Sequence, residues 1–478
     1  MLHQQTLLKM VGLIILIALL SSCSSVGIIF LPYGDLVRPA LQQLDTENPL
    51  AADVALSPFN RYFPHELLYY VEAGRIAQIQ GQISASQQYW MHVRGSIDQT
   101  DAGPLVDVSD LSQQGLALAI NDKARDYMLP AYQKSFLHTF QAWNYLQLHQ
   151  LDDASVEARQ EAYGYQQAVN QNEAARKYIE KQVNRLSLDP KILDQAVDAQ
   201  WIAAENIALP IYSFSNAYAN FMNGFIFELK QQWNDALIEY KKALALNSTN
   251  LFIQKRTWRV ANKLGLQSQV TALMSKPAKV TTAKKASSEI IVIYEQGWIP
   301  ELESKRITVA WNQQVQSMEL PTYRKPWAKQ MGLSVQVDGH PESISQPLLD
   351  VYGLAIKSLQ EQAKSRMIRQ LLRVAVKYEL NTQAQQRGGD IGLALSSMYG
   401  IVSEQADLRT WLSLPNTVHL ASFLVEPGAH KIEWRDQTTG LTQSLALQSL
   451  AHHTQIIRVM NTGNRYYSQT VDYENSLL

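Results

Sequence analysis

Cysteine is almost absent from this sequence, since Cys23 is the only one in 478 residues. A single thiol cannot close an internal disulfide, and it cannot supply the set of thiolates that holds structural zinc or an iron–sulfur cluster. The 10 histidines are scattered, and no HExxH pair places two of them on one helix face for a metal. The sequence therefore predicts no metal site and no cofactor.

Motifs of catalysis are absent too. There is no Gly-x-Ser-x-Gly elbow for a nucleophilic serine, and the glycine-containing run 387–392 lacks the lysine of a phosphate-binding loop. A net charge of -1 argues against nucleic acid as a partner, because neutralising phosphates needs a basic surface. We predict that the protein is not an enzyme and has no catalytic residues. An enzyme whose site is assembled only by the fold is the alternative.

Long apolar runs are limited to one, Met10 to Leu20. Its length is typical of the apolar region of a signal peptide, and a membrane-spanning helix needs about 20 such residues. Ser21 and Ser22 precede Cys23, an order that resembles the lipobox of bacterial lipoproteins. The resemblance implies a signal peptide at 1–22, cleavage between Ser22 and Cys23, and acyl chains on Cys23 that bind a membrane. An ordinary secretory signal or an uncleaved anchor helix are the alternatives.

The membrane in which such a lipoprotein resides depends on the residue that follows the acylated cysteine. Here it is Ser24, rather than the aspartate that resembles an inner-membrane retention signal. We therefore expect an outer-membrane lipoprotein that faces the periplasm. Residues 23–47 are expected to form the acylated N-terminus and its tether.

The residue pattern changes once along the chain. From 48 to 274 apolar residues recur at helical spacing, which predicts an all-α domain. Residues 275–288 ("SKPAKVTTAKKASS") have little to bury and predict a linker. From 289 to 478 short β-branched runs between Gly/Pro turns predict an antiparallel, sandwich-like domain with one helix inserted at 347–383. The predicted fold class is α+β with several domains.

The second half carries the clearest strand and helix patterns. The segments expected to be strands are 289–295, 306–311, 333–338, 418–425, 430–434 and 455–459. In the inserted helix an apolar stripe recurs at helical spacing and is expected to face the sheet. The stripe comprises Tyr352, Ala355, Leu359, Ala363, Met367, Leu371, Ala375 and Tyr378.

Residues 217–250 resemble a tetratricopeptide repeat. The matching positions are Gly224, Phe227, Ala236, Tyr240 and Ala243, with the glycine where a neighbouring helix must approach closely. A weaker match contains Gly74, Ser86 and Trp90, and the loosest contains Tyr145, Ala154 and Ala158. Helix pairs of this kind leave a groove that binds peptides or helices. A plain helical bundle is the alternative.

One face of the inserted helix is basic. Arg366, Arg369, Arg373 and Lys377 are spaced three or four residues apart. Guanidinium groups in such a row could bind an acidic partner surface or the carboxylates of cell-wall peptides. The alternatives are a solvated face, or internal pairing with acidic residues such as Asp407.

Several blocks of the second half resemble a known family. They are "IYEQGWIPELESKRI", "SMELPTY", "SRMIRQLLRVAVKY" and "ADLRTWLSLPNTVHLASFLVEPGAHKI". The resemblance is to uncharacterised bacterial outer-membrane lipoproteins with tetratricopeptide-like repeats and a C-terminal β-rich domain, and it implies location and architecture. In the block 406–415 we expect Asp407 to pair with Arg409 and Trp411 to plug the sheet.

These features predict a binding scaffold. Its partner would be a periplasmic or outer-membrane protein, held at a membrane by the acyl chains of the scaffold, in envelope biogenesis or the assembly of an envelope system. The alternative is binding of peptidoglycan or another glycan by the β-rich domain, with Trp298, Trp311 or Trp327 stacking on sugar rings.

Overall fold

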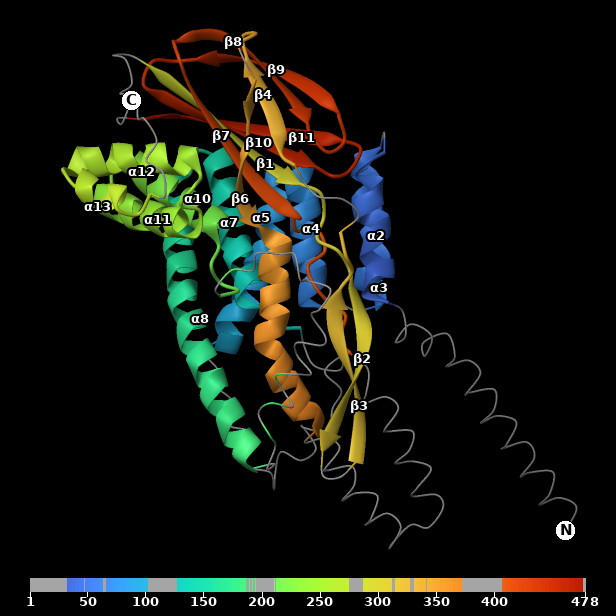
Figure 1. Cartoon of the computed structure of the whole chain (residues 1–478). Coiled ribbons are helices and arrows are strands. Elements are labelled where there is room, and N and C mark those ends of the chain that lie inside the picture. Colours follow the sequence, from blue (N-terminus) through green and yellow to red (C-terminus); the bar gives the residue numbers. More distant parts are fainter. Residues whose placement is uncertain are drawn as a thin grey trace, which may run out of the picture.

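The computed structural model describes residues 32–46, 48–62, 66–101, 127–185, 212–274, 287–311, 314–326, 331–340, 342–371 and 406–475, with single positions at 189, 191, 194 and 210. The signal peptide, Cys23 and residues 275–286 lie outside them. Within them helices come first, strands follow from residue 288, and one helix lies among the strands (Figure 1). The predicted mixture of α and β structure is confirmed.

The first described helix, α2 (Tyr33–Gln43), is packed against the rest of the protein. Its apolar residues share one face and are buried in the main core: Leu36, Val37, Ala40 and Leu41. The turn η1 (Pro49–Ala51) leads to α3 (Ala52–Tyr62). From Tyr33 onward, the segment expected as a tether is therefore a core helix, because burying such a face is favoured over leaving it in water.

Polar contacts fix the start of α2. The guanidinium group of Arg38 donates to both carboxylate oxygens of Glu301, each at 2.7 Å. The hydroxyl group of Tyr33 donates to Glu72 at 2.9 Å. α2 is thus attached through Arg38 to the segment just before β2 (Leu302–Trp311), and through Tyr33 to Glu72.

Three helical hairpins follow. They are α4 (Leu67–Ile79) with α5 (Ile83–Asp101), α7 (Ala131–Gln147) with α8 (Leu151–Arg185), and α10 (Ala217–Leu229) with α11 (Trp233–Leu246). Two further helices are α12 (Leu251–Leu264) and α13 (Gln267–Thr271). Each hairpin contacts the next, with α5 against α7 and α8 against α10. The hairpins therefore stack side by side.

The three hairpins share one turn. In each, the second residue after the first helix has positive φ, and the residue that follows it, a glutamine, donates its backbone N–H to a carbonyl of the last helical turn. This is the hydrogen-bond pattern of a left-handed helix cap. The positive-φ residues are Gly81, His149 and Gln231, and the glutamines are Gln82, Gln150 and Gln232. The three hairpins therefore share one turn geometry.

The strands form three sheets. The largest has the order β11-β10-β1-β7-β6, built from β1 (Ser288–Gln296), β6 (Gln346–Asp350), β7 (Thr417–Val425), β10 (His453–Asn461) and β11 (Tyr466–Glu474). The second has the order β5-β4-β8-β9, built from β4 (Leu333–Val337), β5 (Ser343–Ile344), β8 (Gly428–Asp436) and β9 (Thr442–Ser449). β2 pairs with β3 (Gln314–Tyr323) in a separate ribbon.

The expectation of purely antiparallel pairing is wrong for one pair. β1 and β10 run parallel, with Ile291 beside Ile456, so the five-stranded sheet is mixed. Parallel strands need a long crossover rather than a hairpin, and here the connection includes the strands of the second sheet. The residue pattern of either strand alone carries no sign of this partner.

The inserted helix begins later than expected. Residues 346–350 form β6, and helix 351–371 follows, so the predicted start at Pro347 is wrong. Leu349 and Asp350 pair with β7, and the carboxylate of Asp350 caps the helix by accepting the N–H of Gly353 at 2.9 Å. The apolar stripe is buried or nearly so up to Leu371. Ala375 and Tyr378 lie outside the described residues.

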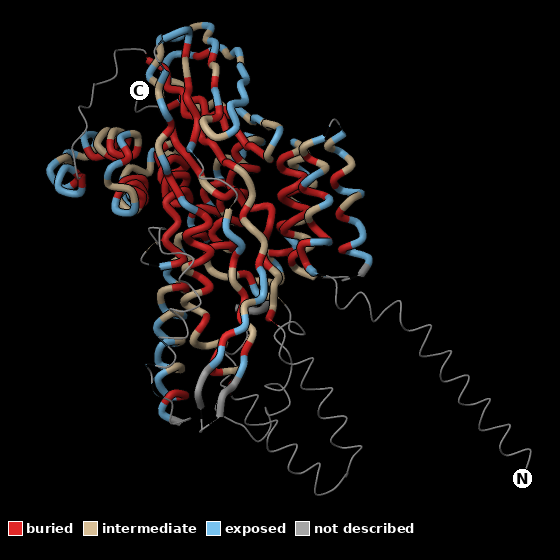
Figure 2. Tube along the Cα trace, turned by 45° about the vertical axis from the view of Figure 1, so that its right-hand side comes forward, coloured by how far each residue is buried: buried red, intermediate tan, exposed pale blue. Residues whose placement is uncertain are grey.

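Alternate residues of β1 face two cores. Ile291 and Ile293 belong to a core shared with the helices, and Ile290 and Val292 to a second core shared with β4 and β8. A strand covered on both faces has a continuous apolar sequence. This explains the uninterrupted apolar residues in 289–295 ("EIIVIYE") of β1. Helices and sheet therefore share one core, and Figure 2 shows this buried interior between them.

Candidate functional site

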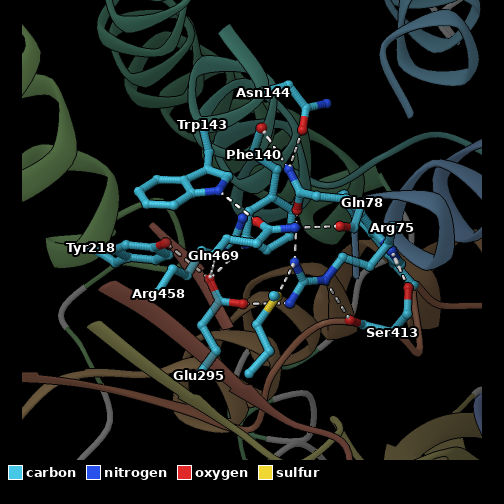
Figure 3. A network of polar contacts seen from close by, with 12 residues as sticks. Arg75, Gln78, Phe140, Trp143, Asn144, Tyr218, Glu295, Ser413, Arg458 and Gln469 are labelled. Atoms are coloured by element: carbon cyan, nitrogen blue, oxygen red, sulfur yellow. Dashed lines mark hydrogen bonds and ion pairs between the residues drawn. The ribbon is translucent and has the colours of Figure 1, made fainter. Parts of the chain in front are cut away.

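Buried charges gather where the first helices of the hairpins meet the five-stranded sheet (Figure 3). Glu295 of β1 accepts hydrogen bonds from Arg458 of β10 at 2.8 Å, from the hydroxyl of Tyr218 of α10 at 2.9 Å, and from Arg75 of α4. The three charged side chains are at most 1% exposed. We call these four residues the helix–sheet junction.

The second hairpin adds the aromatic ring of Phe140 and the amide of Asn144 to the junction. Both guanidinium groups lie over the ring of Phe140, at 4.3 Å for Arg75 and 4.8 Å for Arg458, where the ring attracts cations. Gln78 accepts a hydrogen bond from Arg75 at 2.8 Å and donates to Asn144 at 2.7 Å. All three hairpins and two strands therefore meet at this point.

The charges of the junction stabilise one another. Burial lowers the pKa of Arg75 to about 10, against the opposing effect of the neighbouring Glu295. Burial also acts to raise the pKa of Glu295, but the charges of Arg458 and Arg75 outweigh it and hold that pKa below its ordinary value. A general acid or base needs a pKa near the working pH. This arrangement is therefore suited to joining elements, and poorly suited to moving protons.

The other end of β1 carries a similar group. Arg256 of α12 donates to Glu228 of α10 at 2.8 Å and to Glu289 of β1 at 2.5 Å, and Arg259 donates to Glu289 at 2.6 Å. Burial acts to raise the pKa of Glu289, but the charges of Arg256 and Arg259 outweigh it and lower the pKa to about 2. Both glutamates that flank the apolar run of β1 are thus held by helix arginines.

Glu72 of α4 is a buried carboxylate of a different kind. Its oxygens accept the backbone N–H groups of Leu412 at 2.6 Å and Ser413 at 3.1 Å, and the hydroxyl of Tyr33. Burial raises the pKa of Glu72 to about 7, against these hydrogen bonds, which lower it. No cation pairs with this carboxylate among the described residues. Glu72 therefore joins α4 to α2 and to the block 406–415.

We expect Glu72 to make stability fall as pH rises from about 5 to 8. Its pKa is 4.5 in a model compound and about 7 in the folded protein, so the folded state binds the proton more tightly than the unfolded chain. The stabilising contribution is present below the unfolded value and is lost as pH rises through the folded value. At about 1.4 kcal/mol per pKa unit the loss is on the order of 3 kcal/mol.

Urea denaturation of the wild type and of Glu72→Gln at several pH values measures this contribution. The amide nitrogen of the new glutamine cannot accept the hydrogen bond from the N–H of Ser413, so the variant should be less stable overall. Its stability should nevertheless change less with pH. Equal pH dependence in the two proteins would contradict the assignment to Glu72.

The block 406–415 lies between the helices and the sheet. Asp407 and Arg409 form the expected ion pair at 2.8 Å. Trp411 is fully buried, with its ring edge-on to those of Trp90 at 6.3 Å and Phe140 at 5.9 Å. It therefore packs against α5 and α7, rather than only plugging the sheet, because the hairpins extend over this block.

The two predicted glycines occupy equivalent places in their hairpins. A Cβ atom on Gly74 would lie 2.2 Å from Nε1 of Trp90, and one on Gly224 would lie 2.7 Å from Cδ1 of Tyr240. Each glycine thus lets an aromatic ring of the second helix rest on the first helix. The other predicted repeat residues are buried in the core: Ser86, Phe227, Ala236 and Ala243.

The inner side of the hairpins is covered by the chain's own sheet. α10 is buried from Ala217 to Glu228, and Trp143 of α7 donates to Gln469 of β11 at 2.7 Å. A helix that is apolar on all sides is covered on all sides. The groove that such repeats offer to a peptide is therefore occupied on this side by β1, β10 and β11.

The predicted basic face is described only in part. Arg366 donates to Gln362 of the same helix at 2.8 Å, and Arg366 and Arg369 are both half-buried. Arg373 and Lys377 lie outside the described residues. Asp407, the internal partner considered for this face, pairs with Arg409 instead.

Of the three tryptophans considered for glycan binding, the structure describes one side chain. Trp298 is half-buried and packs against the main core. The side chain of Trp311 and the whole of Trp327 lie outside the described residues.

Among the described residues, no group of three or more His, Cys, Asp or Glu side chains is arranged to hold a metal ion. None of the described helices is both long and apolar enough to cross a membrane.

The charged residues of the junction were not predicted. A usable signal was present in α4, where Glu72 and Arg75 are charged residues within a largely apolar run.

No protein-family model, curated protein or solved structure matches the chain. The family resemblance of the C-terminal blocks therefore stays a prediction.

Proposed function

We propose that the protein is a non-enzymatic outer-membrane lipoprotein that binds a periplasmic or outer-membrane protein partner in envelope biogenesis or the assembly of an envelope system. We infer that its repeats are tetratricopeptide-like and that its two larger sheets form a sandwich-like pair. The observation that supports this best is the set of three stacked hairpins with one turn geometry. Stacked helical repeats commonly build extended binding surfaces for proteins.

The outer layer of hairpins is the surface we assign to the partner. The inner helices are covered by the sheet, whereas α5, α8 and α11 expose large apolar side chains, among them Met91 at 52%, Tyr163 at 61% and Ile238 at 53%. α8 has 35 residues and its partner α7 has 17, so α8 continues as an exposed helix beyond its hairpin (Figure 2). A partner protein could bind along this layer without disturbing the core.

The membrane attachment rests on Cys23. One acyl chain binds a membrane marginally, and two or three hold a protein there essentially permanently. A Cys23→Ala chain should therefore leave the membrane fraction and lose the mass of its lipid. Recovery of this variant in the membrane with no change in lipidation would overturn the lipoprotein assignment.

In-cell photo-crosslinking tests the partner surface. A photoreactive residue at Tyr163 should capture one distinct protein, identified by mass spectrometry, because this side chain is exposed on α8. The matched control is Leu50, which is 60% exposed but lies far from the outer helices in sequence and belongs to η1. Equal products from the two positions, or none from Met91, Tyr163 and Ile238, would contradict the proposal.

A further inference from the structure

β9 is the edge of the four-stranded sheet, at the end of the molecule away from the β2–β3 ribbon (Figure 1). Among the described residues it pairs with β8 alone, in a continuous register from Gly428 with Ser449 to Arg435 with Thr442. Backbone groups of a strand alternate in direction, so about half of those in β9 face away from β8. An edge of this kind is a template for another strand.

Charge, proline and a bulge, which are usual protections of an edge strand, are missing from β9. Its sequence, TQSLALQS, contains no charge and no proline, and its pairing with β8 shows no bulge. The other edges of the two larger sheets are protected: β11 carries Asp472 and lies against α7, β6 contains Pro347 and a register shift, and β5 has two residues. Natural sheets block unwanted pairing with such devices. Their absence from β9 indicates that this edge has a partner.

The strand is close to symmetric about Ala446. Leu445 and Leu447 flank it, and serine and glutamine occupy the positions further out. Two copies that pair antiparallel about a two-fold axis place each residue opposite the one equally far from the axis. A charged residue at or beside the axis would approach its own copy, and like charges opposite each other are destabilising. A strand with no charge avoids this cost.

We propose that β9 pairs with β9 of a second copy of this chain, antiparallel about a two-fold axis at Ala446. Leu445 then lies opposite Leu447, and Ser444 opposite Gln448. The result joins the two four-stranded sheets into one continuous sheet. This inference depends neither on the lipid nor on a partner protein.

The environment of the strand fits this pairing. Leu445 and Leu447 are half-buried against the second core, whereas Ser444, Ala446 and Gln448 are exposed. The carbonyl of Gln448 accepts a hydrogen bond from the side chain of Gln455 at 2.8 Å, so it points away from β8, as do those of Ala446 and Ser444 by alternation. A carbonyl has two lone pairs, so Gln448 can also accept from a second strand.

Introducing a charge of either sign at position 446 tests the proposal. In sedimentation of the detergent-solubilised full chain, the wild type should have twice the protein mass of one chain. Ala446→Lys and Ala446→Glu should each halve that mass, because two like charges meet on the axis. An equimolar mixture of the two variants should restore the doubled mass. Ser468→Lys, at an exposed position of β11, is the matched control and should leave the mass unchanged.

Cysteine crosslinking tests the register with smaller substitutions. Ala446→Cys should form a disulfide dimer on mild oxidation, because paired strands bring opposite Cα atoms within disulfide range. Ser444→Cys should not link to itself, whereas the double variant Ser444→Cys/Gln448→Cys should. The wild type, oxidised in parallel, accounts for Cys23, and circular dichroism checks the folding of every variant. A monomeric wild type, an Ala446→Lys chain that keeps the doubled mass, or equal crosslinking at positions 444 and 446 would overturn the proposal.

Discussion

Glu295→Ala should lower the free energy of unfolding by about 3 to 5 kcal/mol, the usual cost of removing one partner from a buried ion pair. The substitution leaves the guanidinium groups of Arg75 and Arg458, which are at most 1% exposed, without their carboxylate. It also removes the acceptor of the Tyr218 hydroxyl. Urea denaturation followed by far-UV circular dichroism measures the change.

An exposed ion pair supplies the control. Arg306 pairs with Glu319 at 3.1 Å, and the side chain of Arg306 is 71% exposed. Arg306→Ala should therefore cost no more than about 1 kcal/mol. Adding Arg458→Met to Glu295→Ala should recover part of the lost stability, because it removes one of the unpaired buried charges. If Glu295→Ala were as mild as Arg306→Ala, the junction would not be what joins the helices to the sheet.

Trp90→Ala should cost about 3 to 5 kcal/mol, as expected for a large buried ring replaced by a methyl group. Trp90 is 1% exposed, and its ring contacts those of Phe140 and Trp411. Its Nε1 atom donates to the carbonyl of Val71 at 3.2 Å. The loss leaves a cavity at the contact between the first two hairpins, and thermal or urea denaturation measures it.

The double variant with Gly74 gives a sharper test. In the wild type Gly74→Ala should destabilise by about 1 to 3 kcal/mol, because the added Cβ overpacks the site where Trp90 lies 2.2 Å away. In the Trp90→Ala background the same change has room, and alanine favours helix over glycine by up to about 1 kcal/mol. The effect of Gly74→Ala should therefore change sign. The same sign in both backgrounds would contradict the contact.

Local patterns predicted local features of the fold. The apolar run of β1, the stripe of helix 351–371 and the close approach at Gly74 and Gly224 follow from spacing and residue size, which a sequence displays directly. The pairing of Asp407 with Arg409 spans two residues and was predicted as well. Each of these depends on neighbours along the chain.

Long-range pairs were not predictable in this way. Glu295 lies 220 residues from Arg75 and 163 residues from Arg458, and nothing in the three local sequences couples them. The parallel partner of β1 was missed for the same reason. The strands β3 and β11 were missed because polar residues interrupt their apolar pattern. The common turn of the three hairpins became visible only in the backbone.

The docking of α2 sets a limit on where the protein can act. Residues 24–32 are all that separate Cys23 from Tyr33, and an extended chain spans at most about 3.5 Å per residue, so this segment reaches about 30 Å. With the proposed lipid on Cys23, the attachment of Arg38 to Glu301 would hold the fold close to the membrane. The start of α2 could then lie no farther than that distance from the bilayer. Deleting residues from the segment 24–32, or inserting residues into it, would change the distance between the fold and the bilayer without altering the protein's surface.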